Sequence, residues 1–146
     1  MDLSFWGQMG AGLVMGISSL GAAIAMGIAG SATIGAWKRC YKANKPAPMT
    51  LLTFVGFPLT EVFYGFILMR QMLGVANASN GGLLLGVGIA GGIAIAFVAI
   101  AEGWAGAAAA DALTDTGKGF ANYVAIVGVC ETVALFVMVL CMTVLG

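Results

Sequence analysis

Three glutamates lie deep inside long apolar stretches of this 146-residue chain, where carboxylates are unusual. Glu61 and Glu131 each lie near the middle of such a stretch, and Glu102 lies in the later half of another. An ionised carboxylate at the centre of a bilayer costs at least ~2.5–3.5 kcal/mol, so such groups are rarely kept for structure alone. We interpret the three as candidate ion-binding residues. The alternative is that a protonated glutamate forms a hydrogen bond between helices.

Hydroxyl groups accompany these carboxylates in the sequence. Thr60 directly precedes Glu61, Tyr64 lies one helical turn after it, and Thr132 directly follows Glu131. Oxygen ligands of this kind suit hard cations such as Na⁺. The same groups could instead hold a proton in a hydrogen-bond network. The residue types therefore indicate a small cation and leave its identity open.

A proline just before Glu61 adds a backbone oxygen to this set. Pro58 has no N–H and its ring clashes with the carbonyl group four residues back, which disrupts a helix. We expect it to free the carbonyl of Phe54 and to loosen the backbone at Phe57. A loosened carbonyl at Phe57 could then bind a cation.

Composition places the chain in a membrane. Hydrophobic residues make up 61% of it and charged residues only 8%, whereas soluble domains carry about 25% charged residues. The net charge is zero and no long basic run occurs, which argues against a nucleic-acid partner. Histidine is absent, which excludes ordinary His-based zinc, haem and triad chemistry. The three cysteines show no metal-binding spacing.

Four apolar stretches predict an all-α membrane protein with four transmembrane helices, at about 5–37, 49–72, 80–110 and 120–145. Each reaches the roughly 20 residues that a helix needs to cross the hydrocarbon core. We expect two tandem hairpins, residues 1–76 and 77–146. The loop at 38–47 is rich in lysine and arginine, so the positive-inside rule places it in the cytoplasm. The loop at 111–119 then lies on the same side, and both termini lie outside.

Glycine is distributed unevenly among the four stretches. The first and third hold eight glycines each, out of 23, whereas the second and fourth carry bulky aromatic residues. This alternation predicts a two-helix unit used twice, with Glu61 and Glu131 70 residues apart. Small residues four apart let helix backbones approach closely: Gly12/Gly16, Ser31/Gly35, Gly82/Gly86 and Gly88/Gly92. They fit either the core of a simple bundle or an inner circle of helices in a ring.

The segments 57–66 (FPLTEVFYGF) and 129–132 (VCET) give the chain a resemblance to a known family. It resembles the proteolipid (c or K) subunit of rotary V/A-type ATPases over nearly its whole length. Glu102-Gly103 matches a Gln-Gly pair of that family. The resemblance implies that copies assemble into a rotor ring in which each essential carboxylate carries one ion.

The resemblance also implies a ligand set for the ion. Glu131 would carry it, and the partners would be Thr60, Glu61, Glu102 and the carbonyl of Phe57. The Tyr64 hydroxyl would brace Glu131, and Thr132 is a further candidate beside it. If the ion is sodium, its ligands would be side-chain oxygens of Glu131, Glu61, Glu102 and Thr60.

The chain departs from the family pattern at two of these positions, since Glu61 and Glu102 each replace a glutamine. Three like charges in one pocket cannot all ionise. Either two protons stay bound while one charge exchanges, or Glu61 serves a separate site in its own hairpin. The first hairpin has only Ala32 at the position equivalent to Glu102. We expect Na⁺ or H⁺ as the transported ion, with a slight preference for Na⁺, and no tightly bound cofactor.

The resemblance further implies a non-catalytic subunit of an ATP-driven ion pump or ATP synthase. Its partners would be further copies in a homo-oligomeric ring, a stator subunit with an arginine, a central stalk docked on loops 38–47 and 111–119, and membrane lipid. A prokaryotic cell membrane is the expected location. One alternative is a small four-span proton-coupled antiporter, but that class carries its essential glutamate in the first span, which has none here. Another is a purely structural four-span protein.

Overall fold

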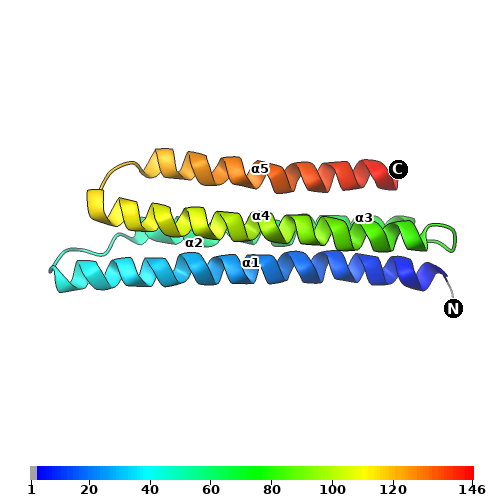
Figure 1. The fold of residues 1–146 in the computed structure, drawn as a ribbon, viewed down its shortest axis with the longest axis horizontal. Coiled ribbons are helices and arrows are strands. Elements are labelled where there is room, and N and C mark those ends of the chain that lie inside the picture. Colours follow the sequence, from blue (N-terminus) through cyan, green and yellow to red (C-terminus); the bar gives the residue numbers. More distant parts are fainter. Residues whose placement is uncertain (1–2) are drawn as a thin grey trace.

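The computed structural model describes residues 3–146, and within them the chain is entirely helical apart from its short connections. The helices form four long rods that lie side by side (Figure 1). The first, third and fourth rods are α1 (Leu3–Lys42), α4 (Gly81–Thr116) and α5 (Phe120–Leu145). The second rod consists of α2 (Leu52–Gly56) and α3 (Thr60–Val75), with 3₁₀ turns at Met49–Leu51 and Phe57–Leu59.

All four rods are long and apolar enough to cross a membrane. The prediction of an all-α membrane protein with four spans is therefore confirmed. Both described ends of the chain lie at the same end of the bundle as the connection 76–80, and the connections 43–48 and 117–119 lie at the opposite end (Figure 1). The rods thus form two consecutive helical hairpins.

The helices that enter the loop end are longer than the sequence predicted. α4 runs through Asp111 and Asp115, so the prediction that both lie in a loop is wrong. No helix-breaking residue occurs there until Gly117, which adopts a left-handed backbone with φ of 67°. The Gly117 amide donates to the carbonyl of Leu113 and closes the helix. Polar residues beyond an apolar span can simply continue its helix.

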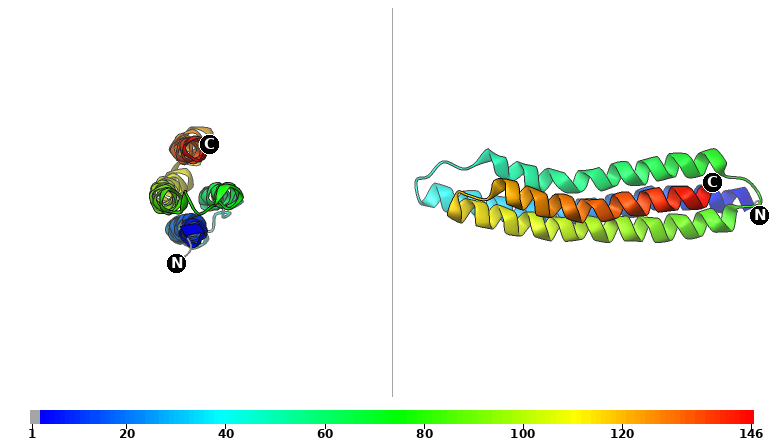
Figure 2. Two further views of the ribbon diagram at one scale, coloured as in Figure 1. Left: turned by 90° about the vertical axis from the view of Figure 1, so that its right-hand side faces the viewer. Right: turned by 90° about the horizontal axis from the view of Figure 1, so that it is seen from above.

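The two glycine-rich helices, α1 and α4, pack backbone against backbone. A Cβ atom at Gly88 would collide with the carbonyl of Gly10, and one at Gly103 would stand 2.6 Å from the Cα of Ala25. Such close approach requires small residues on both helices. In the end-on view of Figure 2, α4 lies between α1 and α5, and α3 lies to one side of them.

The glycine pairs of the sequence divide into two groups. Gly88 and Gly92 lie at the contact with α1, as a bundle core requires. A second group of glycines has no atom within 4 Å of where a Cβ would be: Gly12, Gly16, Gly35, Gly82 and Gly86. Contacts within the chain therefore account for only part of the small-residue pattern, and faces of α1 and α4 are left open.

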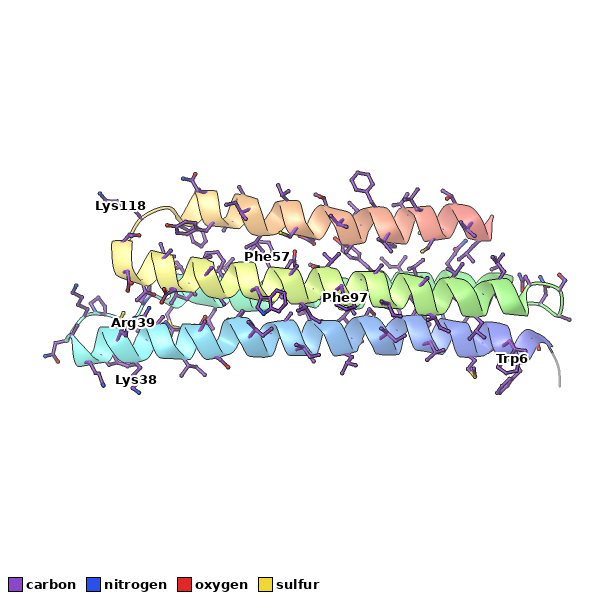
Figure 3. All side chains as sticks on the ribbon, viewed as in Figure 1. Trp6, Lys38, Arg39, Phe57, Phe97 and Lys118 are labelled. Carbon is purple, nitrogen blue, oxygen red and sulfur yellow. The ribbon has the colours of Figure 1, made fainter. Side chains whose placement is uncertain are left out.

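A charged cluster joins the two hairpins at the loop end. Arg39 on α1 forms a salt bridge with Asp111 on α4 and lies 3.6 Å from a carboxylate oxygen of Asp115. Figure 3 shows Arg39 on the side of α1 that faces α4, and Lys38 on the opposite side. The second rod is fixed to α1 at the same end, where the Trp37 indole N–H donates to the Pro48 carbonyl at 2.9 Å.

Candidate ion-binding site

The second rod is broken at Pro58, and the break supplies the backbone oxygens of the site. Residues 57–59 form a 3₁₀ turn between α2 and α3, as the missing N–H of proline predicts. The Thr60 hydroxyl donates to the carbonyl of Phe57 at 2.8 Å. The carbonyl of Phe54 faces Gly106 on α4, where a Cβ atom would stand only 2.9 Å away. The break thus brings the Phe54 carbonyl of the first hairpin against Gly106 of the second.

Glu131 lies on α5, partly exposed, and is held by a residue of the first hairpin. The Tyr64 hydroxyl donates to Oε1 of Glu131 at 2.8 Å. This is the contact that the family resemblance implied. Hydrogen bonds to a carboxylate are stronger than neutral ones, so Tyr64 fixes one oxygen of Glu131 and leaves the other available.

Glu61 and Glu102 are both fully buried and face each other across the contact between α3 and α4. Their carboxyl groups are close enough to share a hydrogen bond when one carries a proton. Thr60 Oγ1 lies 3.2 Å from Oε2 of Glu61. The remaining Glu61 oxygen and both Glu102 oxygens have no other hydrogen-bond partner among the described residues. Charge interactions link the pair to Glu131, so the three carboxyl groups form one cluster.

No salt bridge among the described residues involves any of the three glutamates. A buried carboxylate without a cationic partner is costly, so the charge of this cluster must be balanced by something that residues 3–146 do not provide. Within the same residues no group of three or more His, Cys, Asp or Glu side chains is arranged to hold a metal ion. A sodium ion would therefore also need the hydroxyl and carbonyl oxygens.

Thr132 is placed differently from the other candidates. Its hydroxyl donates to the carbonyl of Val129, one turn back on α5, at 2.6 Å, and its side chain is exposed. The structure brings together Thr60, Glu61, Tyr64, Phe57, Glu102 and Glu131. The Thr132 hydroxyl is instead bonded to its own helix. A role for Thr132 in binding stays a prediction.

Two packing contacts that position the site were not predicted from the sequence. Gly106 makes room for the freed Phe54 carbonyl, and Gly65 packs directly against Ser18 of α1. Both glycines face backbone or side chains of another helix at close range. Pro58 indicated a freed carbonyl at Phe54, but it did not indicate which residue of another helix would lie against that carbonyl.

Comparison with known proteins gives one family. The family model for the C subunit of ATP synthase matches two segments of the chain, residues 9–70 and 85–144. The chain belongs to this family. Each matched segment covers most of one hairpin, so the two hairpins are two copies of the unit that the family model describes. The chain is a c/K proteolipid of the rotary ATPases.

A curated relative supports the same assignment. The chain is similar to the A-type ATP synthase subunit K of Methanocaldococcus jannaschii, with 30% identity over 136 residues. The alignment covers 93% of this chain and 60% of that relative, so the chain spans about three fifths of the relative's length. The family match leaves the small antiporter and the purely structural four-span protein without support.

Proposed function

We propose that this chain is an ion-translocating subunit of the rotor ring of a V/A-type ATPase or ATP synthase, and that Glu131 carries one Na⁺ or H⁺. The observation that carries the proposal is the placement of Glu131. Its carboxyl group is partly exposed in mid-span, is held on one side by Tyr64 at 2.8 Å, and interacts with the buried pair Glu61 and Glu102.

The proposed mechanism follows from the cost of charge in a membrane. A loaded Glu131 is neutral, so it can turn through lipid with the ring. An empty Glu131 is negatively charged and cannot, because an isolated charge in hydrocarbon is expensive. It must therefore meet a polar channel in a stator subunit, where an arginine balances it. Rotation is thereby coupled to ion movement, while ATP synthesis or hydrolysis takes place in other subunits. This chain is itself non-catalytic.

The open faces of α1 and α4 support the ring. Glycines on these faces have no neighbour within the chain, and small residues favour close contact between membrane helices. We propose that adjacent copies fill these faces, and that lipid surrounds α3 and α5. The central stalk would dock at the loop end, where Arg39, Asp111 and Asp115 cluster. That end would face the cytoplasm of a prokaryotic cell.

A carbodiimide experiment tests the carrier. Dicyclohexylcarbodiimide reacts with protonated carboxyl groups that are accessible from the apolar phase. In the purified chain in mild detergent, Glu131 should react slowly at high pH and faster as the pH falls. Protection by millimolar Na⁺ would identify sodium as the ion. Absence of protection at every pH would identify the proton. Absence of any reaction at Glu131 would contradict the proposed function.

A further inference from the structure

The chain has two glutamates at matching positions of its two hairpins, Glu61 and Glu131, and so could carry either one ion or two. The two hairpins are offset by 70 residues, and this offset relates position 61 to position 131. If both glutamates exchange ions, a ring of these chains moves two ions per chain in each turn. We infer that Glu131 is the only exchanging carboxyl group and that Glu61 is a positioning residue of the same site. This inference rests on the proposed function.

Burial separates the two glutamates first. Glu131 is partly exposed, whereas Glu61 has no exposed surface. Glu61 lies on the face of α3 that also holds the buried residues Gly65, Leu68 and Met72. Gly65 on this face packs against Ser18 of α1, and Leu68 lies beside Gly91 of α4. Glu61 therefore points into the bundle, away from any surface where a stator could reach it.

The contacts of Glu61 tie it to the second hairpin's site. Its carboxyl group faces Glu102 of α4, and Thr60 lies 3.2 Å from its Oε2. Tyr64, one turn further along α3, instead reaches Glu131 of α5. The helix α3 thus contributes both Glu61 and Tyr64, one turn apart, to the surroundings of Glu131.

A separate site around Glu61 would lack the counterparts of Glu102, Tyr64 and Thr60. At the 70-residue offset, Glu102 corresponds to Ala32, Tyr64 to Ala134 and Thr60 to Cys130. None of these three can brace a carboxyl group as a tyrosine or threonine hydroxyl does.

The helix break is also missing from the second hairpin. Pro58 corresponds to Gly128, and α5 runs unbroken from Phe120 to Leu145. α5 therefore has no counterpart of the 3₁₀ turn at which the Phe57 carbonyl accepts from both the backbone N–H and the hydroxyl of Thr60. The matching glutamates therefore have unequal surroundings, and only one complete set of oxygen ligands exists in the part of the chain that the structure describes.

Counting and locating carbodiimide adducts tests this inference. The assembled protein in mild detergent is treated with dicyclohexylcarbodiimide, adducts per chain are counted by intact mass, and their positions are found by peptide mapping. The wild-type chain should take one adduct, on Glu131. Glu131→Gln should take none, and Glu61→Gln should still take one on Glu131. Glu131→Asp, which keeps a carboxyl group at the carrier position, should take one adduct at residue 131.

The possible failures are distinguishable. An adduct on Glu61 in the wild-type chain or in Glu131→Gln would overturn the inference and leave the proposed function standing. A wild-type chain that takes no adduct at any pH would overturn the proposed function itself. Native mass of each variant shows whether it assembles. If Glu131→Gln does not assemble, the adduct positions in the wild-type chain and in Glu131→Asp decide between one carrier and two.

Discussion

At the scale of single residues, the site depends on a hydroxyl group from one hairpin that holds a carboxyl group of the other. Tyr64 donates to Glu131 at 2.8 Å. Hydrogen bonds to charged groups contribute roughly 1.5–3 kcal/mol. Tyr64→Phe should therefore weaken Na⁺ binding about tenfold or more, measured as the Na⁺ concentration that reduces carbodiimide labelling of Glu131 by half.

Tyr123→Phe is the matched control for that substitution. Tyr123 packs over Gly119 at the start of α5, far along the helix from Glu131. Tyr123→Phe should leave the carbodiimide labelling profile of Glu131 unchanged. An unchanged profile in Tyr64→Phe would show that the hydroxyl group does not hold the carrier.

The two threonines beside the glutamates should differ in their effects. Thr60 joins the Phe57 carbonyl to Glu61, whereas the Thr132 hydroxyl is bonded within α5. Thr60→Val should weaken ion binding about fivefold, the equivalent of a hydrogen bond of about 1 kcal/mol. Thr132→Val should have a smaller effect in the same labelling assay. A larger effect from Thr132→Val would return Thr132 to the ligand set that the sequence indicated.

Much of the site could be predicted because its chemistry is local in the sequence. Thr60, Glu61 and Pro58 are close neighbours, and Glu131 is recognisable as an acid in an apolar span. The direction of a side chain could not be predicted this way. Glu61 and Glu131 occupy matching positions, yet one is buried against Glu102 and the other is partly exposed, because that difference depends on how four helices pack.

At the scale of the helices, close contact between α1 and α4 holds the two hairpins together. Gly88→Ala would place a methyl group against the carbonyl of Gly10. Overpacking of this kind costs about 1–3 kcal/mol. We expect a lower thermal unfolding temperature in detergent, measured by circular dichroism.

Gly74→Ala serves as the control for the helix contact. Gly74 is exposed on α3, and no atom lies within 4 Å of the point where a methyl group would be added. This substitution should leave the unfolding temperature unchanged or raise it, because alanine stabilises a helix relative to glycine by up to about 1 kcal/mol. Equal unfolding temperatures for Gly88→Ala and the wild type would mean that α1 and α4 do not pack as described.

The number and order of the helices followed from hydropathy, whereas their ends did not. An apolar stretch records where the hydrocarbon core begins and ends, and the helix hydrogen bonds continue beyond it. α4 therefore carries Asp111 and Asp115 past the predicted end, until Gly117 stops it. Which glycines meet inside the chain was also unpredictable, because Gly82/Gly86 and Gly88/Gly92 have the same spacing but different surroundings.

At the scale of the whole molecule, the salt bridges of Arg39 connect the hairpins only at their loop ends. The side chains that form them, Arg39, Asp111 and Asp115, are about half exposed or more. Exposed ion pairs contribute at most about 1 kcal/mol to the free energy of unfolding. Arg39→Ala should therefore lower the unfolding temperature only slightly. A large loss of stability in calorimetry would show that the loop end, and not the glycine contact, holds the hairpins together.

The central claim is that one chain is a single segment of a rotor ring with one ion carrier. Electron cryo-microscopy of the assembly extracted in mild detergent tests it most directly. We predict a closed ring with α1 and α4 of every copy on the inside, α3 and α5 on the outside, and one Glu131 per chain at mid-membrane depth near the outer surface. A monomer or a dimer, or a ring with α3 and α5 facing its centre, would contradict this claim.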